Sequence, residues 1–272
     1  MNKKNNIAVL LPVYNKDSPI YLVKAIKSIE EQTVADKITI LFCIDGPISN
    51  SLMDVCKSAL TYHVLQLKKN CGLAENLNQG VRYALEKGYV FIARMDADDI
   101  SCPSRMELQH NFLLKNPLID ILGGTISIIN DVGENQGQTV TYPKTHHECH
   151  LFFKRRDPVA HPAVMFRNSY FEKAGIYNPD YKKDQDSELW FRGFLNGCKF
   201  ANLEETVLKF RQTSDLFKRR SDIKKSLKFF KLRLKINRKL NFGLTSHIYT
   251  LSYFVLMMMP GFVKKFIYKR FR

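Results

Sequence analysis

The sequence predicts an α/β fold in which helices flank a mostly parallel central sheet, with a basic amphipathic helical extension at the C-terminus. Through the first hundred residues, short apolar segments alternate with amphipathic ones, as in β-α units that build a parallel sheet. Turn-forming residues separate these segments. The 272 residues, 45% of them hydrophobic, suffice for one large core, and the basic residues concentrate near the C-terminus.

The first half predicts four strands and three helices. The strands are expected at residues 7–13, 38–44, 64–67 and 89–95, and the helices at 18–31, 49–60 and 73–86. Ser18 followed by Pro19 indicates a helix start, because serine caps a helix and proline suits its first position. Gly88 is placed to end the third helix.

The second half is less regular. Helices are expected at 103–115 and 187–197, with a short one that ends near Gly175. Extended segments are expected at 119–129, 163–166 and 206–211, and a turn-rich loop at 131–137.

Three carboxylates, Asp96, Asp98 and Asp99, follow the fourth predicted strand directly. Like charges so close repel one another unless a cation or hydrogen-bond donors neutralise them. Oxygen ligands favour magnesium or manganese, which keep positions open for substrate phosphates. The cluster therefore predicts a divalent metal site, and the alternative is an ordinary Asp-rich turn before a helix.

Three other polar loops follow predicted strands of the same sheet. They are Pro12-Val13-Tyr14-Asn15, Asp45-Gly46 and Asn70-Cys71-Gly72. Ligands of open α/β sheets gather beyond the carboxyl ends of the strands, so four polar loops at one edge predict a nucleotide pocket. Each loop alone also fits a simple strand stop, turn or helix cap.

With these residues in view, the chain resembles the family 2 inverting glycosyltransferases of bacterial surface-polysaccharide synthesis, especially the short non-processive ones. The resemblance spans residues 7–214 and rests on six motifs in order: residues 10–15, 45–46, 70–80, 93–99, 161–162 and 185–190. It implies a GT-A-type fold with a Rossmann-like nucleotide-binding half (1–100) and an acceptor half (101–214), whose choice of acceptor lies in the loops at 131–158.

The resemblance also implies roles for single residues in donor binding. Pro12, Val13, Tyr14, Asn15 and Asp45 would hold the base and ribose, and Asn70, Gly72 and Ala97 would complete the donor site. Asp98 would be the main ligand of a Mn or Mg ion, and Asp96 would contact the ribose or the metal. Arg94 would either touch the donor or pair with a carboxylate.

Inverting transfer needs a base for the acceptor hydroxyl. By resemblance this is Asp186, although Gln185 replaces the glutamate that usually precedes it. The alternative is that Asp186 or Ser187 caps the following helix. Trp190 could stack on the acceptor sugar or lie in the core, and His161 could contact the acceptor or be structural.

The C-terminal segment 215–272 is predicted to be a basic helical tail on an anionic membrane. From Arg211 onward there are 17 Lys and Arg against two acids, whereas the rest of the chain has 25 bases and 24 acids. Lys218 to Lys239 interleaves these bases with apolar residues, and Lys264, Lys265, Lys269, Arg270 and Arg272 follow an apolar segment too short to span a bilayer. The alternatives are a helical hairpin packed on the catalytic domain, and nucleic-acid binding, which the aromatic-rich segment disfavours.

Six cysteines without close pairs and no signal peptide predict a cytoplasmic enzyme, peripheral at the inner face of the membrane, that receives a lipid-linked saccharide acceptor. Two rival functions stay open. A sugar nucleotidyltransferase would usually carry a glycine-rich loop after its first strand, which residues 12–15 lack. A noncatalytic basic binding protein for membrane or nucleic acid would not need both Asp98 and Asp186.

Overall fold

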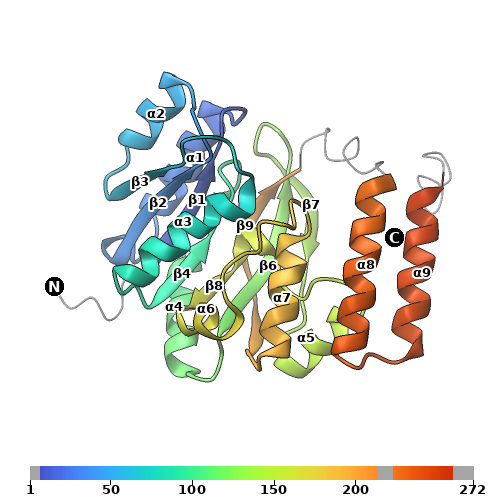
Figure 1. The fold of residues 1–272 in the computed structure, drawn as a ribbon. Helices are drawn as coiled ribbons and strands as arrows, with labels where there is room; N and C mark the ends of the chain where they lie inside the picture. The colour runs from blue at the N-terminus through green and yellow to red at the C-terminus, as the bar shows by residue number, and fades with distance from the viewer. Residues whose placement is uncertain (1–6, 213–222, 260–272) are drawn as a thin grey trace.

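A computed structural model describes residues 7–212 and 223–259, and within them a nine-stranded sheet forms the centre of the protein (Figure 1). Its strands are β1 Ile7–Val13, β2 Ile38–Ile44, β3 Tyr62–Gln66, β4 Phe91–Arg94, β5 Ile100–Ser101, β6 Ile121–Ile129, β7 Asn135–Val140, β8 Met165–Arg167 and β9 Phe200–Arg211. The expected bounds of β1 and β2 are confirmed to the residue.

The sheet joins a parallel half to a mixed half. Its order is β3-β2-β1-β4-β8-β6-β9-β5, and β7 pairs with β6. The four strands from β3 to β4 are all parallel, as predicted for a Rossmann-like nucleotide half. β8 then pairs antiparallel with both β4 and β6, while β6 and β9 are parallel. One continuous sheet therefore carries both halves.

The helices cover both faces of this sheet (Figure 1). They are α1 Pro19–Glu30, α2 Asn50–Lys57, α3 Leu73–Glu86, α4 Arg105–Lys115, α5 His146–Phe153, α6 Ser169–Ala174, α7 Gln185–Leu195, α8 Ile223–Lys239 and α9 Leu244–Met258. The 3-10 turns η2 Ala35–Lys37 and η3 His161–Ala163 complete the described elements. Ser49 caps α2 by accepting the Leu52 amide at 3.3 Å, whereas Ser18 precedes Pro19 without a side-chain hydrogen bond.

The alternating side chains of β1 show why its sequence is apolar throughout. Ile7, Val9 and Leu11 are buried in a core shared with α1, α2 and α4. Ala8 and Leu10 are buried on the opposite face, in a core shared with α3, α6 and α7. Successive strand residues point to opposite faces, so a strand covered on both sides has no polar face.

The structure corrects the prediction of loops between residues 131 and 158. β7 and α5 occupy much of this segment. The start of α5 had a signal in the sequence, because Thr145 and Glu148 form a capping box in which each side chain binds the other's backbone amide. No sequence signal marks β7, because Asn135–Val140 is mostly polar and exposed. This segment forms a strand by pairing with β6. β9 also begins at Phe200, earlier than the expected 206.

The C-terminal helix α8 lies next to α7, and α9 lies beside α8 on the side away from α7 (Figure 1). Leu232 and Ile236 on one face of α8 are buried in the core that also holds Phe153. Arg233 donates to the main-chain oxygen of Phe153, so this face of α8 packs against α5. The alternative of a packed hairpin therefore describes α8 and α9, and the inner face of α8 cannot lie on a membrane as predicted.

Within the described residues, no helix is long and apolar enough to cross a bilayer. The predicted basic residues 264–272 and the predicted boundary between residues 214 and 215 lie outside the described residues.

Candidate active site

The carboxyl ends of β1 and β2 bring two of the predicted donor loops together. The backbone amide of Asp45 donates to the oxygen of Val13 at 2.9 Å, extending the parallel pairing. The buried carboxylate of Asp45 accepts the amides of Cys71 at 2.6 Å and Gly72 at 3.0 Å. Asp45 therefore fixes the loop that leads into α3, where Asn70 is exposed.

Gly46 permits the close approach of these two loops. Its φ of +83° lies in the left-handed region, and a Cβ added there would meet the backbone nitrogen of Asn70 at 2.6 Å. A side chain at this position would push the loops apart. The close approach of the two loops therefore requires glycine at position 46, and Asp45 holds the second loop through its hydrogen bonds.

The loop after β1 holds a carboxylate that was not among the predicted site residues. Pro12 and Val13 are buried in the strand, Tyr14 is half-buried and Asn15 is exposed. Asp17 closes the turn, because its carboxylate accepts the Tyr14 amide at 2.9 Å. Burial raises the pKa of Asp17 to about 7, the Tyr14 hydrogen bond opposes this, and the charges of Asp98 and Asp96 add to it. Asp17 therefore lies near Asp98 and Asp96, and the sequence signal that could have identified it is an acid two residues after Asn15.

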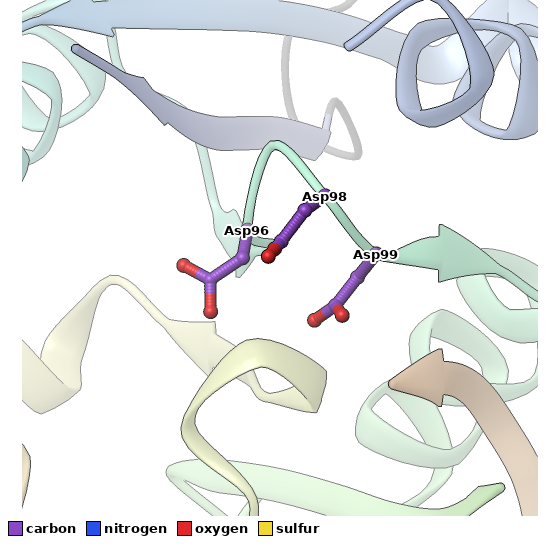
Figure 2. Close-up of side chains that lie close together, drawn as sticks. All are labelled: Asp96, Asp98 and Asp99. Atoms are coloured by element: carbon purple, nitrogen blue, oxygen red, sulfur yellow. The ribbon is translucent and has the colours of Figure 1, made fainter. Parts of the chain in front are cut away.

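Asp96, Asp98 and Asp99 project from a single turn after β4 (Figure 2). One carboxylate oxygen from each lies within 4.8 Å of the others, an arrangement that could hold a metal ion. Asp99 is fully buried, while Asp96 and Asp98 are partly exposed. The intervening Ala97 is buried.

Arg94, at the end of β4, pairs with Asp96. Its Nη1 donates to one carboxylate oxygen at 3.0 Å, and its Nη2 donates to the other. Of the two roles considered for Arg94, the structure shows the ion pair. The guanidinium is buried and its Nε has no partner among the described residues.

The acidic turn fits a divalent cation chemically. Burial raises the pKa of Asp98 to about 6, with a further contribution from Asp96. Burial, together with the charges of Asp96 and Asp98, raises the pKa of Asp99 well above its usual range. One oxygen of Asp99 is buried without a hydrogen-bond partner in the described part of the chain. Arg94 already neutralises Asp96, whereas burial disfavours the charged forms of Asp98 and Asp99 unless a cation binds them. Clustered carboxylate oxygens of this kind are ligands that suit Mg²⁺ or Mn²⁺.

Asp186 lies in the first turn of α7, where it is half-buried. Its Oδ1 accepts the Ser187 amide at 2.9 Å. Burial raises the pKa of Asp186, the Ser187 amide and Arg94 lower it, and Asp96 raises it. The carboxylate of α7 thus lies within electrostatic reach of Arg94 and Asp96. The residue that precedes α7 is Asp184, at φ 60°, so neither Asp186 nor Ser187 is the helix cap considered above.

Two of the predicted acceptor residues lie in the protein interior. Trp190 is fully buried against Phe166 and Phe200, which leaves no face for a sugar, and the predicted stacking role is wrong. His161 is buried, its Nε2 bonds to the Tyr177 hydroxyl at 2.8 Å, and burial lowers its pKa well below the usual range, so it is structural. Gln185 is buried, and its Oε1 lacks a partner within the described ranges.

This fold and site define a class of protein that comparison with known families identifies. The model of the family described as Glycosyl transferase family 2 matches residues 8–173, and the chain belongs to that family. It is a glycosyltransferase, which excludes the nucleotidyltransferase alternative.

Several relatives match almost end to end. The chain is 29% identical to the amylovoran biosynthesis glycosyltransferase AmsE of Erwinia amylovora, covering 97% of this chain and 98% of that protein. It is 28% identical to the Escherichia coli UDP-Gal:alpha-D-GlcNAc-diphosphoundecaprenol beta-1,3-galactosyltransferase, covering 97% and 95%. The O-antigen biosynthesis glycosyltransferase WbnJ of E. coli is 31% identical over 75% of this chain and 79% of its own.

The fold is also that of a solved structure. Residues 1–349 of S. aureus TarS in complex with UDP superimpose with a TM-score of 0.64 at 15% identity, covering 93% of this chain and 69% of that one. In the comparison with a longer TarS chain, the match covers 93% of this chain and 43% of the TarS chain. This likeness shows that the fold is of the same type.

Proposed function

We propose that this chain is an inverting glycosyltransferase that moves a sugar from a UDP-sugar to a lipid-linked saccharide acceptor during synthesis of a bacterial surface polysaccharide. The observation that carries the proposal is that Asp186 lies near enough to Arg94 and Asp96 for their charges to act on its pKa, and we take this to mean that Asp186 and the acidic turn line one site. The relatives that act in amylovoran and O-antigen biosynthesis support a role in surface-polysaccharide synthesis. The related galactosyltransferase supports a UDP-sugar donor and a diphosphate-linked lipid acceptor. TarS structures with UDP and UDP-GlcNAc support the same nucleotide.

The reaction needs one proton transfer and one displacement. The acceptor hydroxyl gives its proton to a carboxylate oxygen of Asp186 while its oxygen forms a bond to the anomeric carbon. The bond from that carbon to the diphosphate oxygen breaks on the opposite side, UDP leaves with the electron pair, and the configuration inverts. The reaction needs no covalent intermediate between the sugar and Asp186. Gln185, the neighbour of Asp186, would contact the acceptor.

The loops at the sheet edge would hold the donor. Residues 12–15, Asp45 and the Asn70–Gly72 turn surround the place proposed for the base and ribose. A divalent Mn or Mg ion held by Asp98 and Asp96 would supply Lewis-acid stabilisation of the departing diphosphate.

The C-terminal hairpin would bring this site to a membrane. Leu244, Ile248, Leu251, Val255 and Met258 recur every three or four residues along α9 and are all exposed. Such a stripe lies on one helix face and has no partner in the described parts of the chain. Exposed bases of α8, namely Lys228, Lys231, Lys235 and Arg238, supply positive charge for an anionic lipid surface. We propose that residues 215–272 form this anchor and residues 1–214 the catalytic unit, at the inner face of the cell membrane.

A donor panel tests the proposal. Purified protein is incubated with Mn²⁺, individual UDP-sugars and polyprenyl-diphosphate saccharides, and UDP release and the anomeric configuration of the product are measured. Transfer with inversion from one UDP-sugar is expected, and Asp186→Asn should abolish it while UDP still binds. Retention of configuration, or full turnover by Asp186→Asn, would exclude the mechanism.

A further inference from the structure

Asp157 lies just before Pro158, between α5 and η3, and contacts the first turn of α7. Both of its carboxylate oxygens are 2.7 Å from the Ser187 hydroxyl oxygen. The backbone amide of the same Ser187 donates to Asp186 at 2.9 Å. Ser187 therefore links two carboxyl groups, one through its side chain and one through its main chain.

The segment that carries Asp157 is held on two sides. Asn202 of β9 donates to the oxygen of Pro158 at 2.9 Å, which ties the segment to the sheet. On the other side, the buried Arg233 of α8 donates to Phe153 at the end of α5, and its charge also acts on Asp157. Asp157 is thus presented to α7 from a rigid support and not from a free loop.

Asp157 supplies what the sequence around Asp186 lacks. Gln185 puts an amide directly before the proposed base, at the position where the family resemblance leads us to expect a glutamate. Asp157 brings one to the same helical turn from 29 residues earlier. We propose that Asp157 is a positioning residue for Asp186: through the Ser187 hydroxyl it fixes the first turn of α7, and with it the direction of the Asp186 carboxylate. This inference rests on the proposed function, because it takes Asp186 as the base.

The charges around the pair agree with this arrangement. Burial raises the pKa of Asp157 to about 7, the Asp186 charge raises it further, the Ser187 hydroxyl and Arg233 lower it, and Asp184 raises it. Other groups that interact with the pair are Tyr142, with Arg156 beside it, near Asp157, and Arg94, Asp96 and Tyr177 near Asp186. Neighbouring carboxyls resist ionising together, so a proton on Asp157 leaves Asp186 as the carboxylate that can accept one.

Four variants test the proposal in the full-length protein: Asp157→Asn, Ser187→Ala, Ser187→Thr and the control Asp180→Asn. Asp180 is exposed in the loop before α7, and within the described residues its side chain forms no hydrogen bond or ion pair with that helix. We expect Asp157→Asn and Ser187→Ala each to lower kcat about tenfold or more, because small misplacements of a catalytic group are costly. KM for the donor and UDP affinity should stay unchanged, since the donor loops lie on other elements.

The conservative variant and the double variant separate positioning from mere folding. Ser187→Thr keeps the hydroxyl and should restore most of kcat, and Asp157→Asn combined with Ser187→Ala should lose no more than either alone. If Asp157→Asn and Ser187→Ala both keep kcat within about twofold of the wild type while Asp186→Asn is inactive, the positioning role is overturned and the base assignment survives. If Asp186→Asn is fully active, the proposed base fails and this proposal fails with it.

Discussion

The backbone amide of Arg211, at the end of β9, donates to the carboxylate of Asp99 at 2.8 Å, across 112 positions of the chain. The Nε of the Arg211 side chain also donates to the main-chain oxygen of Asp98 at 2.8 Å. The central carbon of its guanidinium lies over the Tyr21 ring, 4.3 Å from the ring centre. Nη1 also binds the oxygens of Asn130 and Asp131 at 2.8 Å each. The last strand of the catalytic unit thus fixes the acidic turn that follows β4.

Arg211→Lys should therefore loosen the acidic turn although it keeps the charge. A lysine lacks the planar fork that reaches three main-chain oxygens at once, and the buried oxygens lose their donors. We expect a loss of about 1–3 kcal/mol in the free energy of unfolding, measured by urea denaturation, and weaker Mn²⁺ binding. Arg82→Lys is the matched control, because Arg82 is an exposed partner of Glu75 and should change stability by less than about 0.5 kcal/mol. Equal effects of the two variants would show that Arg211 does not organise the turn.

Asp98 predicts how metal binding depends on pH. With its pKa raised to about 6 by burial and by Asp96, Asp98 holds a proton below that pH, and a metal ion must displace it. Mn²⁺ should raise the Tm of the wild type at pH 7.5, and the shift should shrink as pH falls below about 6. Asp98→Ala should abolish the Mn²⁺-dependent shift at every pH. An undiminished shift in that variant would place the ion elsewhere.

The sequence sufficed for the donor half because local pattern and tertiary environment agree there. β1, β2 and α3 have the predicted bounds, since a strand buried on both faces is apolar throughout and Gly72 and Gly88 flank the helix. The acidic turn and Asp45 were found because polar residues that directly follow such strands are conspicuous. These signals are local, so one sequence is enough to read them.

The acceptor half depends on contacts that no local pattern encodes. β7 is polar and becomes a strand through its pairing with β6. For Trp190, only the contacts with Phe166 and Phe200 decide between a sugar-stacking position and a core position. Asp157 could not be connected to Ser187 without knowing how α5 and α7 meet. For the same reason, the inner face of α8 was interpreted as a membrane face although it packs on the protein.

Asp157 also predicts a pH dependence of stability that is independent of activity. Burial, with the charge of Asp186, raises its pKa from 3.8 to about 7, so the folded protein holds a proton that the unfolded chain releases between those values. Stability attributable to this group therefore falls as pH rises from about 4 to about 7. Asn cannot titrate, so Asp157→Asn should gain stability relative to the wild type over this window, measured by urea denaturation at pH 4.5 and 8. Groups with raised pKa values that do not interact with Asp157 are present in both proteins and cancel. A difference that does not change with pH would contradict the burial of this carboxyl.

Gly46→Ala should disturb the donor loops. The added methyl group would lie 2.6 Å from the Asn70 nitrogen at a φ of +83°, so the variant suffers both a backbone clash and conformational strain. Gly137→Ala is the matched control, since Gly137 has φ +68° but nothing within 4 Å of an added Cβ. We expect about 1 kcal/mol of destabilisation for Gly137→Ala from strain alone, and clearly more for Gly46→Ala, with weaker UDP binding only in the latter. Identical losses and unchanged UDP affinity would mean that the two loops need not touch.

The exposed stripe of α9 predicts that one charge will detach the protein from membranes. Leu251 lies in the middle of the stripe and is 55% exposed, so Leu251→Glu should remove apolar contact and repel anionic headgroups without disturbing the core. Binding to vesicles that contain phosphatidylglycerol, measured by sedimentation, should fall about tenfold, while UDP binding stays at the wild-type level.

The control for the stripe is Leu118→Glu, which places the same charge at a residue that is 80% exposed in the turn before β6. It should bind vesicles as the wild type does, because a single apolar side chain outside the stripe contributes no continuous surface. Binding of wild-type protein should also weaken in high salt, since part of the attraction comes from the α8 lysines and salt screens exposed charges. If Leu251→Glu binds as tightly as Leu118→Glu, α9 does not face the lipid, and the hairpin serves only to support α7 and the Asp157 segment beneath it.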